Sequence, residues 1–192
     1  MITTRLPSRS FCLIRHGETT ANAAEIIAGV TDVPLTQMGC DQARALSHRL
    51  WREPIALYAS PMSRAQRTAG LAFPHRKFEL HDGLRERDWG VFEGQPLSNQ
   101  PVREDTPDRG ESWPDMLMRV QTTIIEICAA SEAALPIMVC HSGIIRAARV
   151  LWTTGEVGQR PPNAMPVLFE NAGQQMLEKT LRPKPRQPLC DL

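Results

Sequence analysis

Short apolar runs alternate with segments of helical periodicity along most of the chain. Phe11 to Ile14 and Ile55 to Ala59 are runs of strand length, and Ile137 to Cys140 is the most apolar of the set. Between and after them, apolar residues recur at three- and four-residue steps, as on a helix with one buried face. This alternation predicts an α/β fold, a three-layer α/β/α sandwich around a largely parallel mixed sheet.

Helix start signals refine this pattern. Thr36 and Ser112 are good N-cap residues, and Pro114 suits the first turn of the helix after Ser112. Helices are therefore predicted from Thr36 through Leu50, from Pro61 through Thr68, from Ser112 to Ala130, and over Ile144 to Leu151.

The remaining segments are shorter or more polar. Phe78 to Leu80 is a candidate third strand, and residues 167–170 and 175–180 are predicted to pair around Asn171-Ala172-Gly173. The proline-containing stretch 95–110 is predicted to be a short cap. One domain is expected over residues 1–180, and residues 181–192, with their three prolines, are expected to form a flexible tail.

Charge and cysteine content exclude several classes of protein. Twenty-two basic and twenty-one acidic residues give a formal charge of +1, so no strong field favours nucleic acid or an anionic membrane. The five cysteines form no C-x-x-C pair, which argues against a disulfide framework and a zinc site and favours a cytoplasmic location. Neither a targeting segment nor a membrane span is visible, and no metal site is expected. The sequence leaves the oligomeric state open.

Candidate chemistry lies where strands end. Arg15 and His16 follow the first strand, and His141 follows the strand before Ser142-Gly143. Ligands of parallel α/β sheets bind beyond the carboxyl ends of the strands, so these side chains are expected to share one site. A single strand-end histidine is a weak signal, because most such residues are structural.

Further motifs strengthen that signal. They are Ser60-Pro61-Met62-Ser63-Arg64-Ala65-Gln66-Arg67-Thr68-Ala69, Leu84-Arg85-Glu86, Glu93-Gly94, Gly110-Glu111-Ser112 and the stretch from Gly29 to Ala43. In order and spacing, from about Cys12 to Leu151, the chain resembles the histidine phosphatase superfamily. That superfamily includes cofactor-dependent phosphoglycerate mutases, fructose bisphosphatases and alpha-ribazole phosphatases. The resemblance implies a phosphoglycerate mutase-like fold.

The resemblance also implies the phosphate-binding residues. Arg15, Arg64, Asn22 and His141 match positions that bind the phosphoryl group, and planar guanidinium groups suit its oxygens. His141 is expected to donate in its protonated form. Glu18 matches a further position, expected to hold the arginines in place.

His16, Glu86 and His141 are the expected catalytic residues. His16 would attack phosphorus as a neutral imidazole, its tautomer set by a backbone carbonyl near Gly17. By resemblance Glu86 is the proton donor, and Asp88 is the nearby alternative. Trp89 and Trp113 are expected to be packing residues or walls of the pocket.

Two features favour hydrolysis over transfer. The connection over residues 95–110 is short, and Ala28 stands where mutases have threonine. The resemblance thus implies a cofactor-independent phosphohydrolase of histidine acid phosphatase type, acting on a small phosphomonoester through phosphohistidine. Mutase-type phosphoryl transfer and non-catalytic binding of a phospho-ligand are the alternatives. Ser142 departs from the usual glycine, and a side chain there can either crowd the phosphate or donate to it.

Overall fold

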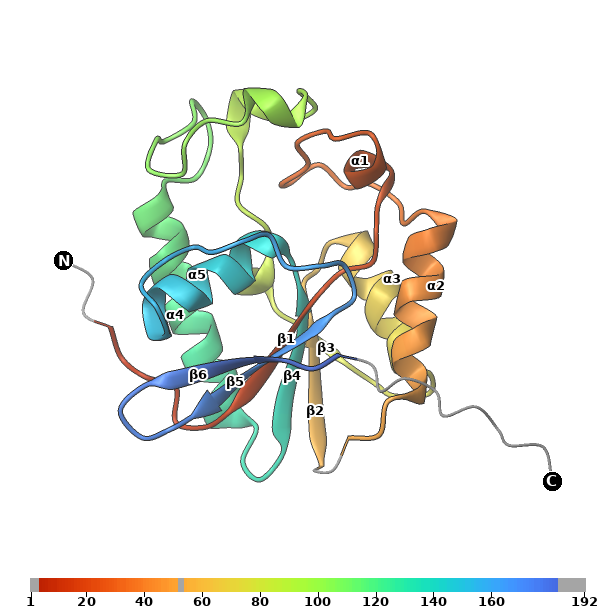
Figure 1. Cartoon of the computed structure of the whole chain (residues 1–192), viewed down its shortest axis with the longest axis vertical. Helices are drawn as coiled ribbons and strands as arrows, with labels where there is room; N and C mark the ends of the chain where they lie inside the picture. The colour runs from red at the N-terminus through yellow and green to blue at the C-terminus, as the bar shows by residue number, and fades with distance from the viewer. Residues whose placement is uncertain (1–3, 52–53, 183–192) are drawn as a thin grey trace.

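The computed structural model describes residues 4–51 and 54–182. Within them a six-stranded sheet has the order β3-β2-β4-β1-β5-β6 (Figure 1). The strands are β1 Phe11–Arg15, β2 Ile55–Ala59, β3 Glu79–Leu80, β4 Leu135–Cys140, β5 Pro166–Asn171 and β6 Met176–Thr180.

The sheet is parallel over four strands and ends in an antiparallel hairpin. β3, β2, β4 and β1 run parallel, whereas β5 pairs antiparallel with both β1 and β6. All residues of β1 are buried, as expected for a central strand covered on both faces. The predicted largely parallel mixed sheet is confirmed, and β5 and β6 form the predicted hairpin with Gly173 in its turn at a φ of 87°.

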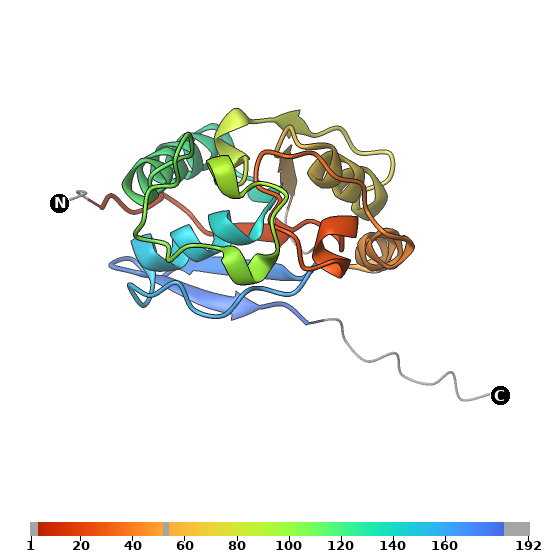
Figure 2. The same ribbon diagram turned by 90° about the horizontal axis from the view of Figure 1, so that it is seen from above.

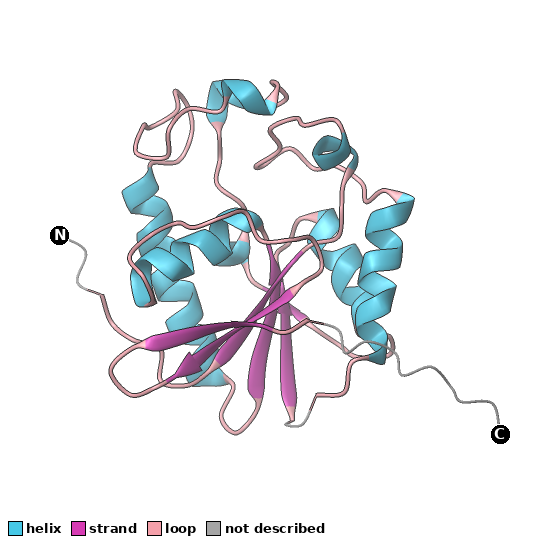
Figure 3. Cartoon of the chain, in the orientation of Figure 1, coloured by secondary structure: helices cyan, strands magenta, loops and turns pink. Residues whose placement is uncertain are grey.

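Helices cover both faces of the sheet, as Figure 3 shows. Seen from above, α2 and α3 lie at one end of the view, away from α4 and α5 (Figure 2). The helices are α1 Thr20–Ala23, α2 Gln37–Ala45, α3 Ser63–Ala72, α4 Trp113–Ala130 and α5 Ser142–Trp152.

Two hydrophobic cores follow from the alternation of side chains along each strand. Phe11 and Leu13 of β1 pack with the core that includes α4 and α5, while Cys12 and Ile14 pack with the core that includes α3. Successive strand residues point to opposite faces, so a strand buried on both sides reads as a continuous apolar run. The apolar runs seen in the sequence have this cause.

The predicted caps are present, but two helix bounds differ. Thr36 and Ser112 accept hydrogen bonds from the backbone N–H groups of Gly39 and Asp115. The helix expected to reach Leu50 ends at Ala45 and continues only as a 3₁₀ turn to His48, leaving Leu50 93% exposed. The backbone at Arg49 is extended, with φ −76° and ψ 124°. Leu50, the next apolar residue of the predicted pattern, therefore lies outside the helix.

Smaller differences occur at the other predicted elements. The helix expected to begin at Pro61 begins at Ser63, with Met62 as its N-cap, and the third strand is limited to Glu79–Leu80. Of the expected tail, residues 183–192 lie outside the described part of the chain. The division into a domain over 1–180 and a tail stays a prediction. No helix among the described residues is long and apolar enough to cross a membrane.

The segment after β3 lies over the carboxyl ends of the parallel strands. In Figure 1 it is the green segment at the top, beside α1. An isolated bridge joins Ile26 to Pro96, and the N–H of Leu97 donates to the carbonyl of Glu25 at 2.7 Å. The predicted cap is thus hydrogen-bonded to the loop after α1 and covers the strand ends.

Candidate active site

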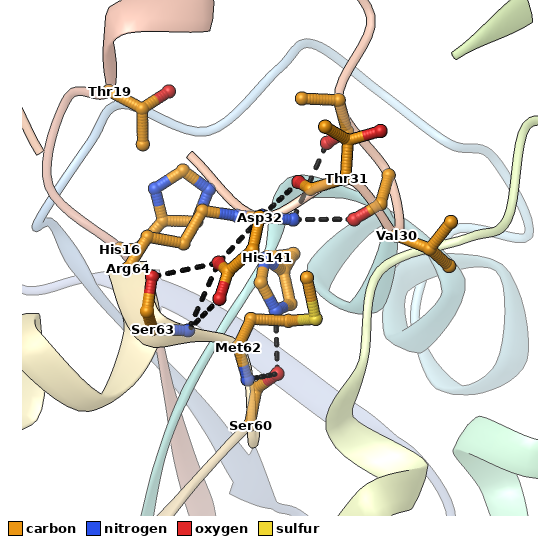
Figure 4. Close-up of polar contacts among 12 residues, drawn as sticks. His16, Thr19, Val30, Thr31, Asp32, Ser60, Met62, Ser63, Arg64 and His141 are labelled. Atoms are coloured by element: carbon orange, nitrogen blue, oxygen red, sulfur yellow. Dashed lines mark hydrogen bonds and ion pairs between the residues drawn. The ribbon is translucent and has the colours of Figure 1, made fainter. Parts of the chain in front are cut away.

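The strand register brings the two candidate histidines together. Arg15 of β1 pairs with Cys140 of β4, so His16 and His141 leave the sheet side by side. Their ring centroids are 5.2 Å apart (Figure 4). The convergence expected from the two strand ends is therefore present.

A small cavity opens beside His16, with a volume of about 60 Å³. Four of the predicted site residues line it: Arg15, His16, Asn22 and Glu86. Arg64 and His141 are absent from its lining and lie buried beside His16. The other lining residues are Ile26, Ile27, Ala28, Trp89, Leu97, Gln100, Ser142 and Arg160.

His16 is buried and held in one tautomer. Its Nδ1–H donates to the carbonyl of Gly17 at 2.7 Å, since a carbonyl can only accept. Nε2 then keeps its lone pair. Burial, then the positive charges of Arg64 and Arg15, lower the pKa of His16 to about 3. The neutral imidazole, the nucleophilic form, is thus the form present near neutral pH.

Gly17 has to be glycine because another backbone segment touches it. A Cβ at this position would lie 2.3 Å from the carbonyl oxygen of Gly39. The Gly17 N–H donates to Thr68 Oγ1 at 3.0 Å, and that hydroxyl donates to the carbonyl of Arg64. The turn after β1 is therefore packed against the first turn of α2 and bonded to α3.

His141 is fully buried and uses one ring nitrogen. Nε2 is hydrogen-bonded to Ser60 Oγ at 2.8 Å, and Nδ1 has no partner within the described residues (Figure 4). Burial, then the charges of Arg64, His16 and Arg15, lower the pKa of His141 well below its usual value. The expected protonated His141 is therefore disfavoured here, because no carboxylate offsets its burial among basic groups.

Arg64 is almost completely buried, with 1% of its surface exposed. Its guanidinium donates to the carbonyls of Thr31 at 2.9 Å and Gly29 at 2.6 Å and lies 3.7 Å from Asp32 (Figure 4). The side chain thus supports the loop over residues 28–32, and its charge acts on the neighbouring histidines. A direct bond from Arg64 to phosphate stays a prediction.

Arg15 and Asn22 are held by a loop that sequence reasoning missed. Arg15 Nη1 donates to the carbonyl of Pro161 at 2.8 Å, and its Nε is buried without a partner in the described chain. Asn22 Oδ1 accepts from the Thr19 N–H and from Asn163 Nδ2. Asn163 Nδ2 also donates to the carbonyl of His16. Phosphate binding by Asn22 stays a prediction.

Glu86 lies at the N-terminus of α5. Its two carboxylate oxygens accept from the N–H groups of Arg87 and Gly143, each at 2.9 Å. Asp88, the alternative acid, accepts from Gly90 and does not line the cavity that contains His16. The position of Glu86 therefore makes it the better candidate for proton transfer.

The glycine after Ser142 leaves space for the Glu86 side chain. A Cβ at Gly143 would lie 2.0 Å from Glu86 Oε1, so a larger residue here would displace this carboxylate from its present position at α5. Ser142 itself lines the cavity as a half-buried residue. Ser142 therefore shares this lining with His16 and Glu86.

Glu93 has a supporting role that its motif did not reveal. Its carboxylate accepts from the N–H groups of Gly29 and Thr31 and from that of Trp89. Arg64 binds carbonyls of the same loop, so the loop over 28–31 is held from both sides. Most of these contacts join segments that are far apart in the sequence, so a local sequence pattern does not reveal them.

The expected role of Glu18 differs from its contacts, whereas the two tryptophans take the expected roles of pocket wall and packing residue. Glu18 accepts from Thr36 Oγ1 at 2.8 Å and, among the described residues, forms no ion pair with an arginine. It supports the start of α2 instead, because Thr36 is the N-cap residue of that helix. Trp89 lines the cavity, whereas Trp113 packs under the guanidinium of Arg103.

Comparison with known proteins identifies the family. The model of the histidine phosphatase superfamily (branch 1) matches residues 11–173. This chain belongs to the histidine phosphatase superfamily. The matched range includes both strand-end histidines, Arg64 and Glu86.

Individual relatives differ in their stated activities. The chain is 32% identical over 155 residues to a metal-independent phosphoserine phosphatase of Arabidopsis thaliana, covering 70% of this chain and 65% of that protein. It is 31% identical to a probable phosphoglycerate mutase of Proteus mirabilis, covering 67% of each. This chain thus spans slightly less than two thirds of the first relative's length. Membership in this family supports an enzyme of phosphatase or mutase type.

A solved structure agrees with the fold. The crystal structure of TTHB049 from Thermus thermophilus matches with a TM-score of 0.72 and 31% identity, covering 90% of this chain and 98% of that one. The α/β arrangement described above is thus shared by a relative over nearly the whole of its chain.

Proposed function

We propose that this protein hydrolyses a small phosphomonoester through a phosphohistidine at His16. The observation that carries the proposal is the state of that ring. Its Nδ1–H is bonded to Gly17, its pKa lies near 3, and it lines a small cavity together with Glu86. A neutral imidazole with a free nitrogen next to a carboxyl group has the parts needed for nucleophilic and acid catalysis.

In the first step His16 Nε2 bonds to phosphorus while the bond from phosphorus to the leaving oxygen breaks. Glu86 gives its proton to that oxygen, releasing an alcohol. In the second step Glu86 takes a proton from water, the water oxygen bonds to phosphorus, and the bond to Nε2 breaks. The products are inorganic phosphate and free His16. The hydrogen bond from Nδ1 to Gly17 stabilises the positive charge on the phosphorylated ring.

Donors for the phosphoryl oxygens come from several elements. We assign this role to Arg15, Asn22, Arg64 and His141. Nδ1 of His141 can donate without a net charge on the ring, because the Ser60 hydroxyl can donate to Nε2. A bound phosphate dianion would also raise the pKa of His141, so a protonated ring in the complex is compatible with the lowered pKa of the free site.

Two features of the site favour hydrolysis over mutase-type transfer. The cap over residues 95–110 contains a single short helical turn, at Leu97–Asn99, within the described chain. Ala28 lines the cavity at the position where a mutase has threonine. We also propose that turnover needs no metal ion or other cofactor, and we expect a reducing cytoplasmic location for the buried thiols of Cys12, Cys128 and Cys140.

A phosphate-release screen tests the proposal. Sugar phosphates, phosphoglycerates, nucleotides, phosphoamino acids and alpha-ribazole phosphate are supplied with and without a chelator, and the expected result is metal-independent release from at least one of them. Activity lost in chelator and restored by a divalent ion would contradict the proposed absence of a metal.

The mutase alternative, supported by the relative from Proteus mirabilis, needs its own assay. With 3-phosphoglycerate and 2,3-bisphosphoglycerate together, we expect phosphate release to outpace isomerisation. Rapid isomerisation with little free phosphate would favour the mutase. Binding of these compounds without turnover would favour a phospho-ligand binding protein.

A further inference from the structure

The side chain of Glu86 has open space beside it. It borders the cavity that contains His16 and also a second cavity, with a volume of about 310 Å³. Its carboxylate is held by the backbone N–H groups of Arg87 and Gly143. The first of these donors belongs to the next residue of the chain and moves with Glu86. The position of the carboxyl group therefore depends on how the segment over residues 83–88 is fixed.

Arg119 of α4 fixes the start of this segment. Its Nη1 donates to the carbonyls of Gly83 at 2.8 Å and Arg85 at 3.0 Å, and Arg85 directly precedes Glu86. The same turn also lies against α4 one helical turn further on, because a Cβ at Gly83 would overlap Thr123 Oγ1. Arg119 and Thr123 share a face of the helix. The backbone that leads into Glu86 is thus held by α4.

Glu111 holds both Arg119 and the other end of the segment. Its carboxylate accepts two hydrogen bonds from Arg119, from Nε at 2.8 Å and from Nη2 at 2.6 Å. Its carbonyl accepts from Nε of the buried Arg87 at 2.9 Å, and its N–H donates to the carbonyl of Asp88 at 2.9 Å. All three polar groups of Glu111 thus hold residues on either side of Glu86.

The pair of Glu111 and Arg119 is suited to a geometric task. Its side chains are 18% and 21% exposed, so water has limited access to them. A guanidinium group presents its donors in a fixed plane, which lets Arg119 meet two carboxylate oxygens and two carbonyls at once. A lysine keeps the charge but has a single nitrogen on a flexible stem, so it cannot hold both sets of acceptors in the same way.

We propose that Glu111 and Arg119 are positioning residues, which hold the carboxyl group of Glu86 where it can protonate the leaving group. Glu111 is the acidic residue of the Gly110-Glu111-Ser112 motif, and its contacts give that motif a function. This role rests on the hydrolysis proposed above, in which Glu86 is the proton donor. Displacing a catalytic group by about 1 Å can slow a reaction about a hundredfold, so support at a distance affects the rate.

The main test variant is Arg119→Lys, which keeps the charge and loses the planar set of donors. The substrates are glycerol 3-phosphate, an alkyl ester, and p-nitrophenyl phosphate, whose leaving group departs without a proton. Rapid-quench measurements follow phosphoenzyme formation. We expect it to slow about tenfold or more with glycerol 3-phosphate and to change by less than about twofold with p-nitrophenyl phosphate. A merely structural role would slow both esters alike.

Arg149→Lys is the matched control. Arg149 forms an ion pair of the same kind with Glu178, with side chains 13% and 24% exposed, and it also donates to two backbone carbonyls. Those carbonyls belong to Val157 and Gln159, in another part of the chain. Any loss of rate in this variant should therefore be equal for the two esters.

Glu111→Gln is the second test variant, and it decides the test if Arg119→Lys does not fold. It keeps one acceptor for Arg119, so it should show the same selectivity between the esters in a weaker form. Slowing confined to glycerol 3-phosphate supports the proposal. Equal slowing of both esters, no slowing of either, or the same selectivity in Arg149→Lys overturns it.

A measurement without turnover separates this proposal from the proposed hydrolysis. The N–H of Gly143 donates to Glu86 Oε2 at 2.9 Å, so its NMR chemical shifts report where that carboxylate lies. Glu86→Gln gives the reference change. If wild type hydrolyses neither ester, or if Glu86→Gln slows both alike, the proposed hydrolysis or its acid fails and the Gly143 signal decides. A shift in Arg119→Lys that is absent from Arg149→Lys retains the positioning of Glu86, and an unchanged signal overturns it.

Discussion

His16 and His141 occupy equivalent strand ends and differ in what holds their rings. His16 follows β1 and donates from Nδ1 to the carbonyl of the next residue, so Nε2 is free. His141 follows β4 and engages Nε2 with Ser60, a residue that follows β2, so Nδ1 is free. A carbonyl can only accept, whereas a hydroxyl can donate or accept. The first ring is therefore limited to one neutral tautomer suited to attack, and the second can present a hydrogen-bond donor.

The largest expected effect tests this division directly. His16→Ala removes the attacking nitrogen, and we expect phosphate release to fall by about a thousandfold or more, with loss of the acid-labile phosphoenzyme. His141→Ala removes one donor to the phosphoryl oxygens, and we expect a smaller loss, about a hundredfold, with phosphoenzyme still formed. Rates and phosphoenzyme are measured on variants with native circular dichroism. A correctly folded His16→Ala protein with a near wild-type rate would contradict the assignment.

Glu86 gives the next effect in size. Glu86→Gln keeps the carbonyl oxygen of the side chain but supplies no proton, so kcat should fall about a hundredfold for alkyl esters. The first, burst-phase step should be relieved for p-nitrophenyl phosphate, whose leaving group departs without a proton. Arg64→Ala is the matched comparison, expected to raise KM as well as lower kcat. Equal slowing of the burst for activated and alkyl esters would shift attention to Asp88.

Ser60 offers a milder change on the His141 side of the comparison. Ser60→Ala removes the hydroxyl bonded to Nε2, and kcat/KM should fall about five- to tenfold, the scale of one hydrogen bond. Long-range proton–nitrogen NMR of the imidazole should then show changed signals for the ring nitrogens of His141, while those of His16 stay as they are. An unchanged His141 spectrum would show that Ser60 does not position this ring.

The last expected effect concerns stability and pH. The pKa values of both histidines are lower in the folded protein than in the unfolded chain, so the unfolded chain takes up protons first as the pH falls. Stability should therefore be full above about pH 6.5 and decline below it, toward pH 3 for His16, with a slope of up to about 1.4 kcal/mol per pH unit for each histidine. Urea unfolding of His16→Asn and His141→Asn should each show a shallower acid decline. Identical slopes in wild type and variants would contradict the lowered pKa values.

The loop after α5 contrasts with the strand ends because the sequence does not reveal its role. His16 and His141 follow apolar runs, and local patterns located them. Arg160 follows no such signal, because its place in the cavity lining depends on contacts between distant segments, such as that of Arg15 with the carbonyl of Pro161.

The sequence by itself determined the alternation of strands and helices, the caps at Thr36 and Ser112, and the placement of Arg15, His16 and His141 at strand ends. These features depend on residues within a few positions of one another, since side-chain periodicity and capping are local. The resemblance to the family added Glu86 and Asn22 to the expected site residues, and both line the cavity.

Only the tertiary structure decided which ring nitrogen of each histidine is engaged, that Leu50 is exposed, that Glu18 contacts Thr36, and that Glu86 lies against Gly143. It also placed Asn163 and Arg160 at the site, more than a hundred residues beyond His16. The physical reason is common to all of these. Hydrogen bonding, burial and charge act over a few ångströms in space, and the chain brings distant segments to that distance only when the sheet and its two helix layers have formed.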